Sequence, residues 1–195
     1  MVFLSEQLVL WDCETTDNDL AFISGGIPEI VEIGAILIDK DLKKLDEFTS
    51  LVCPQNPELF SENCEALTGI KRAQLEQAKD WAEVWREFAG FTHFAGKKLC
   101  SWGTSDMSLL RNEYSKRRLG FPHNQLGLDA LSMLYWQALR EGMMFKGFSL
   151  KTVCESLGIE RPKRHRALPD ALTILEIWRL LSKSDSPTDI KCIGV

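Results

Sequence analysis

Acidic side chains follow two apolar segments of the chain and open its last predicted helix. Asp12 and Glu14 lie two residues apart at the end of the first apolar run, and Asp106 follows a later apolar run and a turn of small residues. Asp170 lies in the first turn of the last predicted helix, five residues after His165. Because the side chains of a strand alternate between its faces, Asp12 and Glu14 are expected to share one face.

Such a set of side chains suits divalent-metal chemistry. Two like charges on one face repel unless a proton or a cation compensates them, and Mg²⁺ and Mn²⁺ prefer carboxylate oxygens as ligands. Three or four carboxylates can hold two such ions roughly 3.5–4 Å apart, where they clamp the attacking and leaving oxygens of a phosphodiester. An imidazole, largely neutral at pH 7, can accept the proton of the attacking water. The basic residues around the histidine, at positions 161, 163, 164 and 166, would hold backbone phosphates.

Each of these features has a simpler explanation when it is taken alone. Acids at the end of a strand are commonly solvated, and Asp106 in a first helical turn is favoured by capping and by the helix dipole. A single histidine in a loop is usually solvated as well. Trp11 and Cys13, which alternate with the two acids, are expected to point away from the metal-binding face and into packing. The chemistry therefore depends on the whole constellation and not on any one member.

The elements that must position these residues indicate an α/β domain. Short β-branched or apolar runs predict strands at 7–13, 30–39, 44–52, 98–102 and 127–129. Apolar spacings of three and four, together with capping signals, predict helices at 58–67, 71–79, 81–91, 105–119, 130–140, 149–157 and about 168–181. Strands come first and then alternate with helices, an order typical of a mixed sheet flanked by helices.

Composition limits the class of protein. A chain of 195 residues corresponds to about one domain, which we place at 1–183 with a loose tail at 184–195. Its 45% hydrophobic and 26% charged residues exclude a disordered regulator, a collagen-like chain and a membrane protein. The net charge of −5 argues against a histone-like binder but leaves room for a local phosphate-binding patch. The six cysteines form no CxxC pair and no signal peptide is evident, so we expect a reduced, cytoplasmic protein.

Three short motifs occur in a recognisable order. They are the run 12–16 (DCETT), Asp106 after the run 101–103 (SWG), and the run 165–171 (HRALPDA). Together they resemble the three motifs of the DEDDh family of 3′→5′ exonucleases, and they span nearly the whole domain. The strand at 30–39 and the run 67–70 (LTGI) are also similar to that family. The WGxxD form of the second motif is most similar to the branch of histone-mRNA and small-RNA-trimming exonucleases and their bacterial relatives.

The resemblance implies a ribonuclease-H-like fold with a mixed five-stranded sheet flanked by helices. It also implies two Mg²⁺ or Mn²⁺ ions and the release of nucleoside 5′-monophosphates from a 3′-hydroxyl end. In that scheme Asp12, Glu14 and Asp170 bind the first metal ion, and Asp12 also reaches the second. Asp106 holds the second ion, through water, and His165 is the general base.

The resemblance also locates the substrate and shows three departures. Thr15 and Thr16 lie where the family holds the terminal nucleotide. Asp17 stands where a glycine is common, and Ser105 stands where the RNA-trimming members often have an aromatic residue for base stacking. Pro169 precedes Asp170 where a helix former or an acid is more usual, but a first helical turn tolerates proline.

We therefore predict a metal-dependent 3′→5′ exonuclease acting on single-stranded 3′ ends, with RNA favoured over DNA. A proofreading-type DNA exonuclease and an oligoribonuclease share the same five residues and stay open as alternatives. A catalytically vestigial nucleic-acid-binding subunit and a structural α/β protein with accidental motifs are more remote hypotheses. The expected partner is a nucleic-acid 3′ end and not a membrane. A homodimer also stays open, because dimers occur in some branches of the family.

Overall fold

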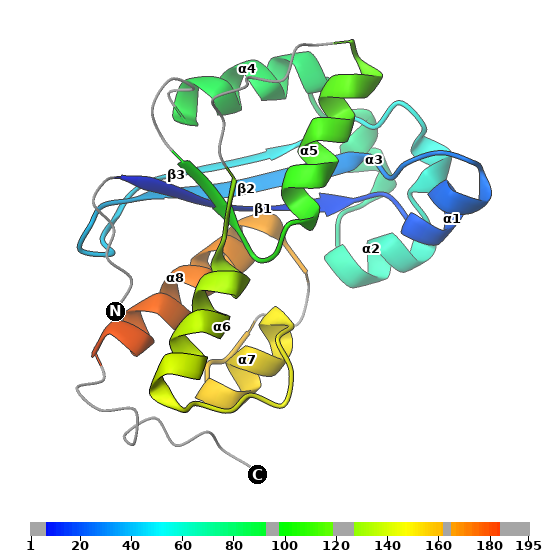
Figure 1. The fold of residues 1–195 in the computed structure, drawn as a ribbon. Helices are drawn as coiled ribbons and strands as arrows, with labels where there is room; N and C mark the ends of the chain where they lie inside the picture. The colour runs from blue at the N-terminus through cyan, green and yellow to red at the C-terminus, as the bar shows by residue number, and fades with distance from the viewer. Residues whose placement is uncertain (1–6, 93–97, 119–126, 162–164, 184–195) are drawn as a thin grey trace.

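A five-stranded sheet forms the centre of the computed structural model, which describes residues 7–92, 98–118, 127–161 and 165–183 (Figure 1). The tail expected at 184–195 lies outside the described residues. The strands are β1 (Leu8–Thr15), β2 (Ile30–Ile38), β3 (Lys44–Leu51), β4 (Lys98–Ser101) and β5 (Gly127–Asp129). Their order across the sheet is β3-β2-β1-β4-β5. The pairs β1–β2 and β2–β3 are antiparallel and the pairs β1–β4 and β4–β5 are parallel, so the predicted mixed sheet is confirmed.

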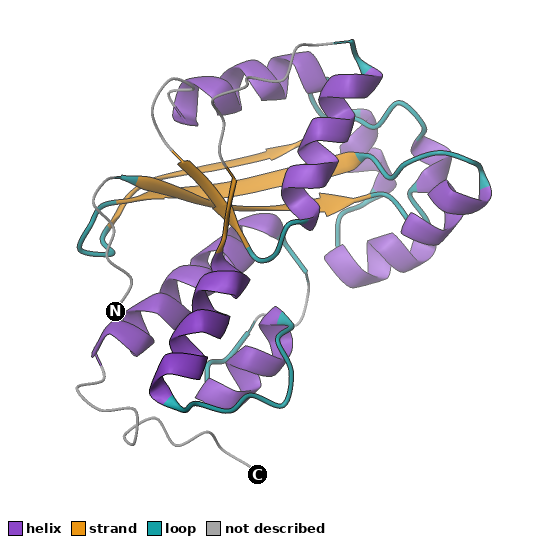
Figure 2. Cartoon of the chain, viewed as in Figure 1, coloured by secondary structure: helices purple, strands orange, loops and turns teal. Residues whose placement is uncertain are grey.

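Helices cover both faces of this sheet. The bounds are α1 (Asn18–Ile23), α2 (Glu62–Thr68), α3 (Arg72–Glu76), α4 (Trp81–Thr92), α5 (Ser105–Lys116), α6 (Ala130–Glu141), α7 (Leu150–Leu157) and α8 (Ala167–Lys183), with the 3₁₀ turn η1 (Pro57–Leu59). Figure 2 shows α4 and α5 on one side of the strands and α6, α7 and α8 on the other, while α1 to α3 gather beyond one end of β1. Among the described helices, none is both long and apolar enough to cross a bilayer.

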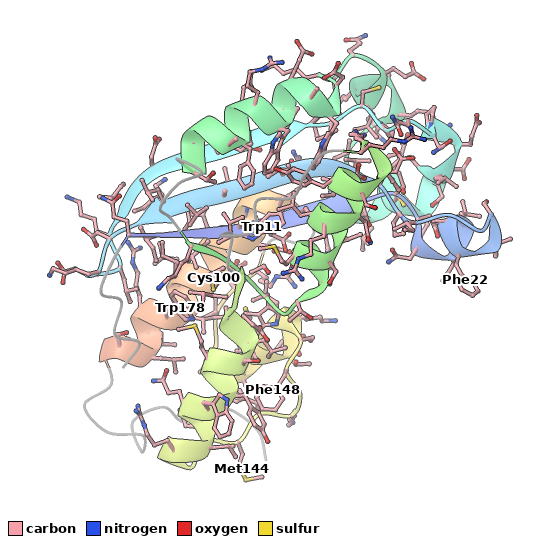
Figure 3. The ribbon with its side chains drawn as sticks, turned by 45° about the horizontal axis from the view of Figure 1, so that its top comes forward. Trp11, Phe22, Cys100, Met144, Phe148 and Trp178 are labelled. Carbon is pink, nitrogen blue, oxygen red and sulfur yellow. The ribbon has the colours of Figure 1, made fainter. Side chains whose placement is uncertain are left out.

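Alternation along β1 divides its side chains between two cores. Leu8 and Leu10 belong to the cluster shared with α6, α7 and α8, which contains Trp178. Val9 and Trp11 belong to the cluster shared with α4 and α5. Trp11 and Trp178 are labelled in Figure 3. The same alternation continues to the end of the strand, so Asp12 and Glu14 lie on the α8 side of the sheet.

A glycine in β2 lets α8 approach the sheet closely. Gly34 is paired with Asp12 in the β1–β2 register. A Cβ atom on Gly34 would lie 2.0 Å from the backbone nitrogen of Leu168 and 2.3 Å from the carbonyl carbon of Ala167. Real contacts of that length do not occur, so the first turn of α8 can rest beside Asp12 only because this position lacks a side chain.

Gly34→Ala is therefore expected to displace the start of α8. The methyl group meets backbone atoms that cannot rotate away, so we expect a loss of about 1–3 kcal/mol in the free energy of unfolding, together with a fall in hydrolytic rate. Gly90→Ala is the matched control, because no atom lies within 4 Å of a Cβ there and the helix tolerates alanine. Urea unfolding and a rate assay measure both effects. A Gly34→Ala protein as stable and as active as the Gly90→Ala protein would contradict the close approach.

Several element boundaries differ from the sequence-based predictions. The strand β1 extends two residues further than expected, to Thr15, so Glu14 lies inside it and not beyond it. The helix expected at 58–67 is divided into η1 and α2, because Phe60 is extended and the Ser61 side chain caps α2 by accepting a hydrogen bond from the Cys64 N–H. The helix expected at 71–79 covers only Arg72–Glu76.

The helix α1 was not predicted at all. Its N-cap is Asp17, whose side chain accepts hydrogen bonds from the backbone N–H groups of Asp19 and Leu20. An acid at this position is a capping signal, but six residues are too few to show an apolar period. The difference from the family pattern at Asp17 thus has a structural reason. Its carboxylate caps the start of a helix, which a glycine has no side chain to do.

Candidate active site

The first turn of α8 brings an acid to the face of β1 that carries Asp12 and Glu14. Asp170 is 5% exposed, and its backbone N–H donates to the carbonyl of Arg166, which closes the first helical turn. Pro169 lies within this turn, where its missing N–H would have had no partner inside the helix. The expectation that a proline is tolerated beside Asp170 is consistent with this geometry.

Three of the predicted site residues lie at metal-ligand spacing. Glu14, His165 and Asp170 each offer one ligand atom, and these atoms all lie within 4.8 Å of one another. The backbone N–H of His165 donates to the carbonyl of Leu67 at 3.1 Å, which attaches the histidine loop to α2. An imidazole and two carboxylates therefore border the same space, although Glu14 precedes the other two residues by roughly 150 positions in the sequence.

Asp12 lies among the other carboxylates without being part of that group of three. Burial raises the pKa of Asp12 well above its usual value, and the nearby charges of Asp106, Glu14 and Asp170 raise it further. All four predicted carboxylates thus act on one another electrostatically. A carboxylate in such surroundings is stabilised by a cation, which agrees with the predicted role.

Asp106 contacts the thiol of Cys13, a residue that was expected only to pack in the core. Cys13 packs in the cluster under α4 and α5, as predicted, but its Sγ also donates to Oδ1 of Asp106 at 3.3 Å. Burial raises the pKa of Asp106, and hydrogen bonds from Cys13 and Ser101 partly oppose this. The predicted packing of Cys13 is thus confirmed, and the contact with Asp106 is an addition that was not predicted from the sequence. The start of α5 lies on the Cys13 side of β1, so a side chain on that face can reach its first turn.

Glu14 holds a proton in the absence of metal over much of the neutral range. Burial, followed by the charges of Asp170 and Glu32, raises its pKa from 4.5 to about 8. A carboxylate must lose its proton to bind a metal ion. Binding of Mg²⁺ should therefore become tighter as the pH rises towards 8 and should release protons.

A pH series of thermal unfolding tests this expectation. Because the folded state raises the pKa of Glu14, its contribution to stability is complete below pH 4.5 and is lost as the pH rises through 8. The increase in Tm caused by Mg²⁺ should accordingly be larger at pH 8.5 than at pH 6. The same series with Glu14→Gln should show a smaller dependence. An Mg²⁺ effect that is equal at both pH values would contradict the assignment.

Two arginines near the site are engaged by carboxylates. Arg161 donates from Nη2 to Oδ2 of Asp170 at 2.5 Å and from Nε to Oδ1 at 3.3 Å. Arg166 pairs in the same way with Glu32 of β2. In this structure these two basic residues pair with acids, and their expected contact with phosphates stays a prediction. Positions 163 and 164 lie outside the described residues.

Arg161→Gln is expected to strengthen metal binding. The guanidinium occupies both oxygens of Asp170, so it competes with any cation for them, and a charged hydrogen bond contributes about 1.5–3 kcal/mol. We expect the Kd for Mn²⁺ to fall about 10-fold and the Tm of the metal-free protein to fall as well. Titration calorimetry with Mn²⁺ measures the first effect. Arg86→Gln, at an exposed position of α4, is the control. Unchanged or weaker Mn²⁺ binding would rule out competition.

The two predicted substrate-binding threonines line a cavity beside Glu14. Thr15 and Thr16 border a space of about 250 Å³ that lies between the end of β1, the start of α1 and α2. The Thr16 side chain is 1% exposed, and its Oγ1 accepts a hydrogen bond from the backbone N–H of Glu29, so it also fastens the β1–β2 connection. Two larger cavities, of about 540 and about 600 Å³, are lined by none of the predicted site residues.

Sequence reasoning missed three residues that the structure places at the site. Glu32 and Gly34 interrupt an otherwise apolar strand, and a charged residue or a glycine inside such a run is a signal that could have been used. Arg161 was noted only as one of several basic residues. Its ion pair with Asp170 could not be predicted from a sequence pattern, because it depends on the path of the chain between Arg161 and the start of α8.

The donor set fits a hard divalent cation. Asp106 and Asp170 are buried, Asp12 and Glu14 are partly buried, and the pKa values of Asp12, Glu14 and Asp106 are all raised. Carboxylates packed so closely gain from a cation that compensates their charge. Glu14 and Asp170 would hold such an ion directly, with the charges of Asp12 and Asp106 close enough to act on them.

Comparison with known proteins gives one family. The family model described as Exonuclease (RNase_T) matches residues 9–178. A PolC-type DNA polymerase III of Caldanaerobacter subterraneus subsp. tengcongensis is 31% identical over 92% of this chain, and the chain spans only 12% of that protein. ERI1 exoribonuclease 2 of Homo sapiens is 27% identical over 78% of this chain and 25% of that protein. The probable 3′-5′ exonuclease KapD of Bacillus subtilis is 24% identical over 80% of this chain and 74% of that protein.

Solved structures share the fold. The nuclease domain of 3′hExo, a DEDDh family member bound to rAMP, superposes with a TM-score of 0.75 at 21% identity, covering 92% of this chain and 93% of that one. Exonuclease I of E. coli, in complex with a dT13 oligonucleotide, gives a TM-score of 0.75 at 17% identity, covering 92% of this chain and 41% of that one. The predicted ribonuclease-H-like architecture is thereby confirmed.

Proposed function

The chain belongs to the Exonuclease (RNase_T) family, and we propose that it is a DEDDh-type 3′→5′ exonuclease that uses divalent metal ions. The observation that carries the proposal is the convergence of Glu14, His165 and Asp170 within 4.8 Å, on the face of β1 that also carries Asp12. The products are nucleoside 5′-monophosphates released one at a time from a 3′-hydroxyl end.

The residues of the chain have distinct tasks in this proposal. Asp12, Glu14 and Asp170 would hold a first metal ion, and Asp106, together with Asp12, would hold a second. Such ions would supply Lewis-acid chemistry and would compensate the negative charge of the substrate phosphate. His165 accepts the proton of the attacking water at a ring nitrogen, because it adjoins the same space from an exposed loop.

The terminal nucleotide occupies the cavity beside Glu14. Thr15 and Thr16 border it from the end of β1, and Leu67 borders it from α2. The backbone N–H of His165 donates to the carbonyl of Leu67, so a hydrogen bond joins the wall of this cavity to the loop of the proposed proton acceptor. A base seated there places its 5′ phosphate towards the carboxylates.

Single-stranded RNA is the substrate that we favour, with single-stranded DNA second. Support for RNA comes from the 3′hExo nuclease domain, which matches 92% of this chain and was solved bound to rAMP, and from the human exoribonuclease. Support for DNA comes from the PolC-type polymerase, which is 31% identical to this chain, and from exonuclease I with dT13. A proofreading-type activity on DNA is thus the second candidate.

A degradation assay tests the proposal. RNA and DNA oligonucleotides of one sequence, labelled at the 5′ end, are incubated with Mg²⁺ or Mn²⁺ and resolved by length. Stepwise shortening from the 3′ end is expected, together with nucleoside 5′-monophosphates, no reaction in EDTA and little reaction on strands blocked by a 3′ phosphate. The faster strand identifies the preferred sugar. If neither strand is shortened with either metal, the exonuclease proposal is wrong.

A further inference from the structure

A buried acid in β2 lies directly opposite one of the proposed metal ligands. Glu32 is 1% exposed, and the β1–β2 register pairs it with Glu14. Paired residues of antiparallel strands point to the same face, and like charges directly opposite each other are destabilising. A buried carboxylate is also costly unless a counter-charge and hydrogen bonds satisfy it. Glu32 therefore requires a fixed cationic partner.

Arg166 provides this partner, and the start of α8 adds to it. The Nε of Arg166 donates to both carboxylate oxygens of Glu32 at 3.0 Å, and its Nη2 donates to Oε1 at 2.5 Å. The backbone N–H of Ala167 donates to Oε2 at 3.0 Å. Ala167 is the first residue of α8, where an N–H has no partner within the helix. Glu32 thus caps α8 from a neighbouring strand, with charge-assisted bonds to an arginine.

The residue immediately before this ion pair is the proposed general base. His165 is held on its N-terminal side by the bond from its N–H to the carbonyl of Leu67, and on its C-terminal side by the bonds of Arg166 and Ala167 to Glu32. Figure 1 shows the start of α8 lying against β1 and β2. The backbone of the histidine loop is therefore attached to the sheet at one residue and to α2 at the other.

We propose that Glu32 and Arg166 form a positioning clamp that holds His165 and the first turn of α8 in their working geometry. Glu32 is not in the group of described side chains that lie at metal-ligand spacing, and its two oxygens accept three bonds from Arg166 and one from the Ala167 N–H. The carbonyl of Arg166 accepts a hydrogen bond from the N–H of Asp170. The clamp therefore also positions the backbone of Asp170 relative to the sheet. The inference rests on the proposed function, since it assigns proton transfer to His165.

Glu32→Gln is the primary test, because it keeps the shape of the side chain and removes its charge. A displacement of about 1 Å in a catalytic group can lower a rate about 100-fold, so we expect kcat to fall between about 10-fold and about 100-fold. KM should stay within about twofold, because the nucleotide cavity is bordered by other residues. Arg166→Gln removes the other partner of the same ion pair, whose side chain is 41% exposed. It should lower kcat to a similar extent and leave KM nearly unchanged.

The chain offers a matched control for a purely structural effect. Glu113 of α5 is also 1% exposed, accepts a hydrogen bond from the backbone N–H of Ile30 and pairs with Arg117. Glu113→Gln should lower Tm to a similar extent as Glu32→Gln and leave kcat unchanged. A loss of kcat in both variants, in proportion to the loss of Tm, would overturn the positioning role.

Combination with His165→Ala separates the clamp from the function on which it rests. If Glu32 acts through His165, the double variant Glu32→Gln with His165→Ala should be no more than about twofold slower than His165→Ala alone. If the fold-loss of kcat in the double variant equals the product of the fold-losses in the two single variants, the clamp proposal is wrong. An inactive wild-type protein would contradict the proposed function instead, and a fully active His165→Ala protein would contradict the base. An active wild type, an impaired His165→Ala and an unimpaired Glu32→Gln would overturn the clamp alone.

Discussion

Asp12→Asn is expected to abolish hydrolysis while making the metal-free protein more stable. The Asp12 carboxyl interacts with the charges of Asp106, Glu14 and Asp170, the other three predicted carboxylates. Loss of its charge removes a ligand proposed to serve both metal ions, and we expect the rate to fall about 10³-fold or more. Because the fold raises the pKa of Asp12, the ionised form opposes folding, and a neutral amide of the same shape relieves this.

The opposite signs of the two effects make this prediction specific. Hydrolysis of the labelled strands gives the rate, and thermal unfolding with and without Mn²⁺ gives the stability and the metal response. Asp46→Asn, at an exposed position of β3, should change none of these quantities. An Asp12→Asn protein that keeps a tenth of the wild-type rate, or that melts at a lower temperature without metal, would contradict the role given to Asp12.

His165→Ala is expected to lower the rate about 10²–10⁴-fold, the range for loss of a general base. The four carboxylates stay in place, so the increase in Tm caused by Mn²⁺ should be nearly that of the wild type. The side chain is exposed, so added imidazole can enter the vacated space and should restore part of the rate. The measurements are the rate, with and without imidazole, and the Mn²⁺ dependence of Tm.

The metal response decides between two roles for this histidine. A ring nitrogen of His165 lies within 4.8 Å of the ligand oxygens of Glu14 and Asp170, close enough for it to be a ligand as well as a base. If His165→Ala loses the Mn²⁺ effect on Tm and imidazole restores nothing, His165 is a metal ligand and the proton acceptor must be sought elsewhere.

Local periodicity was enough to predict much of the architecture and the principal site residues. The alternation of β1 placed Asp12 and Glu14 on one face, and the short strand at 127–129 was predicted with the bounds that it has in β5. Helix α8 was predicted to within two residues at each end, with Asp170 in its first turn. These features depend on neighbours within a few residues, so a linear pattern contains them.

Contacts between distant segments were beyond such reasoning. Gly34 meets the backbone of Leu168, Glu32 meets Arg166, and Cys13 reaches Asp106, across separations of roughly 90 to 135 residues. The motifs indicated that Asp12 and Asp170 act together, but nothing in them showed that Arg161 pairs with Asp170.

Periodicity determines which face of an element a side chain occupies, and it does so from steric and hydrophobic effects that are local along the chain. Which residue of another element contacts that face depends on how closely the two elements pack and on the path of the loops that connect them. In this protein those distances are decided by the absence of a side chain at Gly34 and by the counter-charge that buried Glu32 requires, and both conditions exist only once the sheet and α8 have packed together.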